Sequence, residues 1–290
     1  MFQMKDKRDQ RARPFVGARG KAPGLVLAVL LLAAVPAQAT GPALSGDAAQ
    51  GGLMTGHAPP GSRVTLDDRA VPVAADGTFL LGFSRDAAPR AVLAIAAPDG
   101  AAARETLAVT PRDWPVQRID GLPRDKVTPP PAVLARIRAD AAAARAVRDA
   151  VTRVPDFAAG FAPPALGPIS GVFGAQRILN GRPMAPHSGL DIAAPRGDPV
   201  RAAADGTVVL VRDMVLTGKT VMIDHGLGLV TTYAHCDSVA VHAGEKVRRG
   251  REIGRVGASG RATGPHLHFG VSWLDRRLDP ARIPGILPPG

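Results

Sequence analysis

The stretch Gly264-Pro-His-Leu-His-Phe-Gly270 places two histidines one residue apart in a chain that has only seven. Through Trp273, apolar residues alternate with histidine, glycine and serine, which is the period-2 pattern of a β-strand. Residues i and i+2 of a strand point to the same face, so we expect His266 and His268 to share one side. The other side is apolar and is expected to face a core.

Further strand patterns, punctuated by glycines, surround this one between residues 169 and 280. The runs are DGTVVLVRD (205–213), KTVMIDHG (219–226), GLVTTYAHC (228–236), EKVRRGREIGRVG (245–257) and HLHFGVSWL (266–274). Strands this close together, with no helical pattern between them, predict an antiparallel sheet or barrel.

The first half of the chain has shorter strand patterns and no chemical constellation. They are RVTL (63–66), AVPV (70–73), TFLLGF (78–83), AVLAIA (91–96) and ETLAV (105–109), a spacing that predicts a small β-sandwich. Residues 40–62 are expected to be a loose lead-in that includes His57, and residues 111–131 a proline-punctuated linker. Residues 132–154 have apolar positions at helical spacing, and we expect Pro155 to end that helix.

The N-terminus has the pattern of a secretory signal peptide. Residues 1–23 carry seven Lys/Arg and two Asp, and a short apolar run (25–35) precedes Ala37-Gln-Ala39. That run is shorter than the roughly 20 residues that span a bilayer, so we expect no stable membrane anchor. Cleavage after Ala39 would remove a net +5 and lower the formal charge from +11 to +6. Export of this kind predicts a location outside the cytoplasmic membrane.

These patterns together predict a mainly β protein. We expect a signal peptide (1–39), a small N-terminal β-sandwich-like domain (40–123), a linker with a helix (124–168) and a C-terminal antiparallel β domain (169–290). We also hypothesise that residues 132–168 partly cover a groove in the C-terminal domain, because they lead directly into it.

Four histidines of the second half lie in suggestive settings. They are His187, four residues before Asp191; His235, after Thr-Tyr-Ala; and the pair His266 and His268. Catalytic zinc takes three His or carboxylate ligands and leaves a fourth position open. The chain has no HExxH motif and only three glutamates, none beside a histidine, so proton transfer would fall to histidine. Two histidines for the metal and two for the chemistry would account for all four.

The stretch from Gly171 to Pro280 closely resembles the lysostaphin-like zinc endopeptidases of the LytM type, which cut peptide cross-links in peptidoglycan. The segments that carry the resemblance are HSGLDIAAPRGDPVRAAADGTVV (187–209), VMIDHGLGLVTTYAH (221–235), AGEKVRRGREIGRVGASGRATGPHLHFGV (243–271) and LDP (278–280). The N-terminal half is similar, at QRIDGLP (117–123), to the β-domain of Gram-negative secreted members, which implies a periplasmic enzyme.

The resemblance implies a role for each residue of the constellation. Zinc (Zn2+) would be held by His187, Asp191 and His268. His235 and His266 would orient or deprotonate the water on the metal and steady the oxyanion. The substrate would be the stem peptides of peptidoglycan, and the bond cleaved would be D-Ala–diaminopimelate rather than a pentaglycine bridge.

Two positions depart from the family pattern. Cys236, the only cysteine, stands where Leu is usual, and we expect it to pack as a small hydrophobe. Gly270 stands where many relatives have Glu. The remaining second-half histidines, His225 and His242, are expected in turns or at the surface.

Three other functions are less compatible with the sequence. A catalytically silent activator of a cell-wall amidase, or of another envelope protein, is the main alternative, although all five residues of the constellation are present. A lipoyl-type carrier domain would need a lysine at a hairpin tip, and this chain has none at an obvious tip between matched strands. Nucleic-acid binding is not expected, because Arg and Lys are dispersed and aromatic residues are only 4% of the chain.

Overall fold

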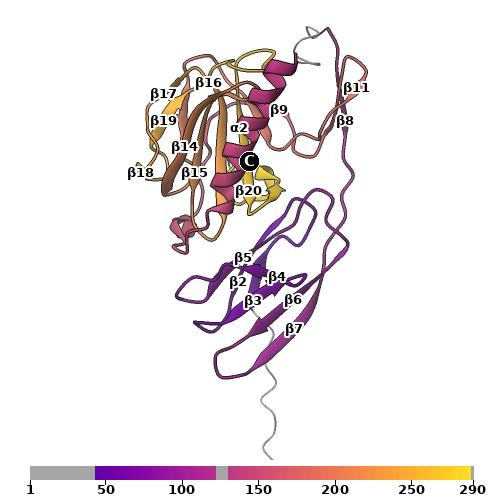
Figure 1. Ribbon diagram of the computed structural model, residues 1–290, viewed down its shortest axis with the longest axis vertical. Coiled ribbons are helices and arrows are strands. Elements are labelled where there is room, and N and C mark those ends of the chain that lie inside the picture. The colour runs from indigo at the N-terminus through magenta and orange to yellow at the C-terminus, as the bar shows by residue number, and fades with distance from the viewer. Residues whose placement is uncertain (1–42, 122–129, 289–290) are drawn as a thin grey trace, which may run out of the picture. The chain divides into compact units, whose positions relative to one another are not determined.

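Figure 1 shows the computed structural model of the chain, which describes residues 43–121 and 130–288. The expected signal peptide (1–39) lies outside the described residues. Within the described ranges, no helix has both the length and the apolar character needed to cross a membrane. The protein is mainly β, as the sequence predicts, with one long α-helix among the described residues.

Two antiparallel sheets form the N-terminal part. Their strands are β1 (Ala43–Gly46), β2 (Leu53–His57), β3 (Arg63–Leu66), β4 (Arg69–Val71), β5 (Thr78–Gly82), β6 (Arg90–Ala96) and β7 (Ala102–Ala108). One sheet has the order β1-β2-β5 and the other β4-β3-β6-β7, and both contribute side chains to one core. The prediction of a loose lead-in at 40–62 is wrong, because pairing with β5 makes a strand of the short, glycine-containing segment β2.

The expected linker at 111–131 also contains a strand. β8 (Val116–Ile119) pairs in parallel with β10 (Gln176–Leu179), which pairs with β11 (Arg182–Pro183). The pairing partner lies some 60 residues further along the chain, so local sequence gave no sign of it. The expected domain boundaries at residues 123 and 168 stay a prediction.

Helix α2 (Pro131–Asp149) ends five residues earlier than expected. Beyond it, the chain contacts the turn between two strands of the large sheet, and these contacts replace further helical turns. Thr152 Oγ1 donates to Asp224 Oδ2 (2.7 Å), and Leu227 N donates to the carbonyl of Thr152 (2.7 Å). A short 3-10 helix, η1 (Asp156–Ala159), follows.

An eight-stranded antiparallel sheet forms the C-terminal part, in the order β18-β14-β15-β16-β20-β12-β9 with β21 beside β20. Its strands are β9 (Ile169–Gly171), β12 (Leu190–Ala193), β14 (Gly206–Met214), β15 (Gly218–Asp224), β16 (Leu229–Cys236), β18 (Lys246–Val247), β20 (His266–Trp273) and β21 (Arg276–Leu278). A small sheet of β13 (Pro199–Arg201), β19 (Glu252–Arg255) and β17 (Ser238–Val239) and a 3-10 helix, η2 (Pro280–Arg282), complete this part.

The two faces of the large sheet have different neighbours. On one face, Leu267, Phe269 and Val271 of β20 are fully buried in the core. On the other face, helix α2 covers an apolar patch. The patch comprises Leu210, Met214, Met222 and Val230, against which Ala143, Ala144 and Val147 of the helix pack.

Asp140, a buried residue of helix α2, joins the helix to this face through an ion pair with the more exposed Arg212. Asp140 is 5% exposed, accepts a hydrogen bond from Nε of Arg212 (2.9 Å), and accepts another from the backbone N of Val215 (2.9 Å). The part of the face beside the helix carries the candidate site.

Candidate metal and catalytic centre

Strand register brings together two of the expected ligands. In the β12–β20 pair, Asp191 lies directly opposite His268, and Ala193 lies opposite His266. Side chains of directly opposed residues share a face of the sheet. His187 reaches the same place from the loop before β12. Glycine at position 189 lets the backbone of this loop pass close to β20, since a Cβ there would lie 2.4 Å from the carbonyl oxygen of Phe269.

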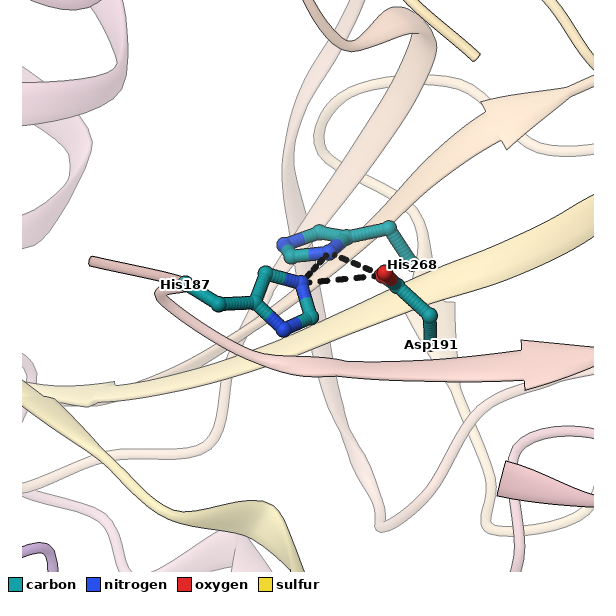
Figure 2. A group of neighbouring side chains, drawn as sticks. All are labelled: His187, Asp191 and His268. Carbon is teal, nitrogen blue, oxygen red and sulfur yellow. Dashed lines mark hydrogen bonds and ion pairs between the residues drawn. The ribbon is translucent and has the colours of Figure 1, made fainter. Parts of the chain in front are cut away.

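Three ligand atoms converge at this point (Figure 2). His187 Nε2 lies 3.0 Å from Asp191 Oδ1 and 3.0 Å from His268 Nδ1, and the last two atoms are 2.8 Å apart. Ligands of a tetrahedral zinc ion, with bonds of about 2.1 Å, lie about 3.4 Å from one another. The separations seen here are close to that value, so the three groups can reach one metal ion with a small movement.

The protons available to these groups also fit a metal ion. His187 Nδ1 donates to the carbonyl of Val172 (2.9 Å), so in the neutral ring Nε2 carries a lone pair. Asp191 is an acceptor, and His268 Nδ1 has at most one proton for its two neighbours. At most one proton is therefore available for the three contacts among His187 Nε2, Asp191 Oδ1 and His268 Nδ1. A cation bound between these atoms would accept the lone pairs that otherwise face one another.

Arg177 of β10 forms an ion pair with Oδ2 of Asp191, the carboxylate oxygen that faces away from the two histidines. Arg177 Nη2 lies 2.5 Å from this oxygen, while Oδ1 faces His187 and His268. Burial raises the pKa of Asp191, but contacts with His187 and His268 outweigh burial and hold the pKa well below its usual range. The carboxylate is thus ionised at neutral pH. Sequence reasoning missed Arg177, because nothing near it in the sequence indicates its partner.

The two remaining histidines stand together beside the cluster. The rings of His235 and His266 are 4.8 Å apart, and His266 Nε2 lies 3.8 Å from Asp191 Oδ1. His235 Nδ1 donates to the carbonyl of Ser259 (2.8 Å), and His266 Nδ1 donates to that of Gly264 (2.9 Å). Each neutral ring therefore presents an unprotonated Nε2, which can accept a proton.

An unusual backbone conformation places His235. Ala234 pairs with His268, so in a regular strand His235 would point to the opposite face. Its φ of +63° lies in the left-handed region, which side-chain-bearing residues seldom adopt, and this allows the ring to reach the site. Burial, and then the neighbouring His268, lower its pKa to about 4, so His235 is neutral at pH 7.

The structure thus brings all five residues of the constellation together; their roles stay a prediction. Of the other histidines, His242 is exposed as expected, whereas His225 lies in a turn but is fully buried. Its Nδ1 lies 2.6 Å from the carbonyl of Asp205 and its Nε2 lies 2.7 Å from Thr231 Oγ1. Cys236 is buried in the core.

The five residues lie within a stretch that matches a known protein family. Residues 185–280, which contain all five residues, match peptidase family M23. A solved peptidase M23 structure from Pseudomonas aeruginosa is 30% identical in sequence and superposes with a TM-score of 0.65. The match covers 83% of this chain and 96% of the solved chain. The chain belongs to peptidase family M23.

Two curated relatives each match about a third of the chain. Peptidoglycan DD-endopeptidase ShyB of Vibrio cholerae is 44% identical over 94 residues, which are 32% of this chain and 22% of that protein. DD-carboxypeptidase/endopeptidase Mpg of Neisseria meningitidis is 48% identical over 97 residues, 33% of this chain and 22% of that protein. The chain thus spans about a fifth of the length of these M23 relatives.

Proposed function

We propose that the chain is a zinc-dependent endopeptidase that hydrolyses peptide cross-links of peptidoglycan. The observation that carries the proposal is the convergence of His187, Asp191 and His268 next to two histidines with unprotonated Nε2 atoms. Two imidazoles and one carboxylate are a ligand set of catalytic zinc, with a fourth position left for water or substrate. A zinc ion bound there supplies Lewis acidity.

Side chains and backbone carbonyls of the protein would transfer the protons and keep the metal ligands in orientation. Nε2 of His235 or His266 accepts the proton of the attacking water, and it can return a proton to the leaving amine. The carbonyls of Ser259 and Gly264 keep both rings in the required tautomer. Arg177 and the carbonyl of Val172 hold Asp191 and His187 in orientation.

The substrate and compartment follow from the relatives and from the N-terminal sequence. Relatives named DD-endopeptidases favour the D-Ala–diaminopimelate bond of the stem peptides. The basic segment, apolar run and Ala-Gln-Ala at residues 1–39 favour export to the periplasm. A cell-wall amidase or another envelope protein is the partner that the amidase-activator alternative would require.

The deciding experiment compares the exported protein with its His266→Ala variant. Zinc content is measured together with digestion of cross-linked muropeptides, and His242→Ala, which changes an exposed histidine, serves as control. We expect zinc in all three proteins, and conversion of dimers to monomers by all except His266→Ala. His235→Ala should behave like His266→Ala. Zinc in every protein with cleavage by none would refute the endopeptidase and favour the amidase activator.

A further inference from the structure

A cavity of about 90 Å3 lies against the side chain of His268, one of the three candidate metal ligands. Its lining includes Arg148 of helix α2 and Arg277 of β21, together with Ser188, Thr232, His268 and Gly270. On this measure one water molecule needs roughly 15 Å3, so the cavity has room for a small polar group of a substrate. It lies on the same face of the sheet as the five candidate site residues.

Strand register explains why Arg277 points into the cavity. It lies opposite Ser272 in the β20–β21 pair, and Ser272 shares a face with Gly270 and His268. Burial, and then the neighbouring Arg148, lower the pKa of Arg277 to about 10, so it remains a cation at neutral pH. Within the described part of the chain, Arg148 is the one charged group that shifts this pKa.

Two polar atoms in the lining have no partner. Among the described residues, the buried side-chain nitrogens and oxygens without a hydrogen bond are Nη1 of Arg148 and Oγ1 of Thr232, and both residues line this cavity. Burial lowers the pKa of Arg148, and the charge of Asp149 opposes that shift. Unpaired buried polar groups are costly, and in native proteins they call for a ligand or another explanation.

Gly270 keeps the cavity open in front of the arginines. A Cβ at this position would meet Thr232 Cβ at 3.6 Å and the carbonyl oxygen of Ser188 at 3.7 Å, which is ordinary contact. Packing of the backbone therefore does not require glycine here. A longer side chain would instead extend into the space that Arg148 and Arg277 line.

We propose that Arg148 and Arg277 bind a carboxylate of the substrate peptide, one that lies next to the scissile amide. Two guanidinium groups on one small cavity repel each other, and an anion between them would turn that repulsion into charge-assisted hydrogen bonds. Thr232 Oγ1 would add a third donor. The cavity borders His268, so the group it holds lies close to the reacting amide.

This inference rests on the proposed function and names the feature of the substrate that is recognised. In a D-Ala–diaminopimelate cross-link, the carbon attached to the scissile nitrogen carries a carboxylate. A pentaglycine bridge has no such group. The arginines would therefore select cross-links whose leaving amine bears a free carboxylate.

The test measures binding rather than turnover. The full-length His266→Ala protein is titrated calorimetrically with two cross-linked peptide dimers, one with the free carboxylate and one with a carboxamide in its place. We expect the carboxylate dimer to bind at least about tenfold more tightly. This preference should disappear when Arg277→Gln or Arg148→Gln is added. Arg138→Gln, which changes an exposed arginine of the same helix, should keep it.

The first comparison needs no arginine variant, so misfolding of a variant does not affect it. Failure to bind the carboxylate dimer, equal affinity for the two dimers, or a preference that survives both arginine substitutions would each overturn the inference. Cleavage of the carboxylate dimer by the unaltered protein tests the proposed endopeptidase separately. An active enzyme without the preference would refute the carboxylate site alone.

Discussion

Asp191 and His268 face each other directly across strands β12 and β20, with Oδ1 of the first 2.8 Å from Nδ1 of the second. Their separation is set by the sheet rather than by a flexible loop. A slip of one residue in this register would move one of the two side chains to the opposite face. The register of these two strands therefore determines the geometry of the candidate metal site.

Replacing a ligand should remove the metal. We expect His187→Ala, Asp191→Ala and His268→Ala to lose zinc, because two remaining ligands hold a divalent ion far more weakly than three. The molar ratio of zinc to protein can be measured by inductively coupled plasma mass spectrometry after dialysis, with His242→Ala as a matched control. Full zinc content in all three variants would show that the ion binds elsewhere.

Arg177 should act on metal affinity through Asp191. Arg177→Gln removes the ion pair that fixes the outer carboxylate oxygen, and loss of such a partner typically weakens metal binding by about 10- to 100-fold. Competition with a chromophoric chelator gives the affinity. Arg196→Gln breaks an exposed ion pair with Asp237 and should leave the affinity unchanged. Equal affinities of the two variants would contradict the role of Arg177.

Buried His225 should make stability depend on pH. Burial lowers the pKa of His225 in the folded protein, so as the pH falls the imidazole is protonated in the unfolded chain before it is protonated in the folded protein. The free energy of unfolding should therefore decrease as the pH falls below about 6.5, the pKa of histidine in the unfolded chain. Denaturant titrations between pH 8 and pH 5 test this, together with NMR of the imidazole nitrogens. A ring that becomes charged near pH 6.5 while the protein is folded would refute it.

Cys236 should be inert in the folded protein. It is 1% exposed, and burial raises the pKa of its thiol to about 12, so the reactive thiolate is scarce. We expect no reaction with a thiol-specific disulfide reagent at pH 8 over an hour, and complete reaction in denaturant. Rapid labelling under native conditions would indicate that this end of β16 opens readily.

Sequence periodicity was sufficient for some features of the site and not for others. The alternation around His266 and His268 predicts their common face, and the structure has both on that face. The same alternation predicts that His235 points to the opposite face of the sheet, and its left-handed backbone conformation turns the ring to the site instead. That conformation depends on tertiary contacts that local sequence does not encode.

Long-range pairing accounts for most of what the sequence did not reveal. β8 became a strand because β10 lies beside it, and helix α2 ended early because Thr152 contacts the turn after β15. Arg177 and Arg277 are two among 36 basic residues, and neither stands in a recognisable motif. Their neighbours become visible only when the strand register is known.

Helix α2 lies outside the stretch 185–280 that matches the family, and this affects how the chain can be divided. A fragment trimmed to the matched residues would keep all five candidate site residues. It would also leave Leu210, Met214, Met222 and Val230 without the helix that covers them. Such an uncovered apolar patch promotes self-association, so a soluble fragment for recombinant expression has to begin before Pro131.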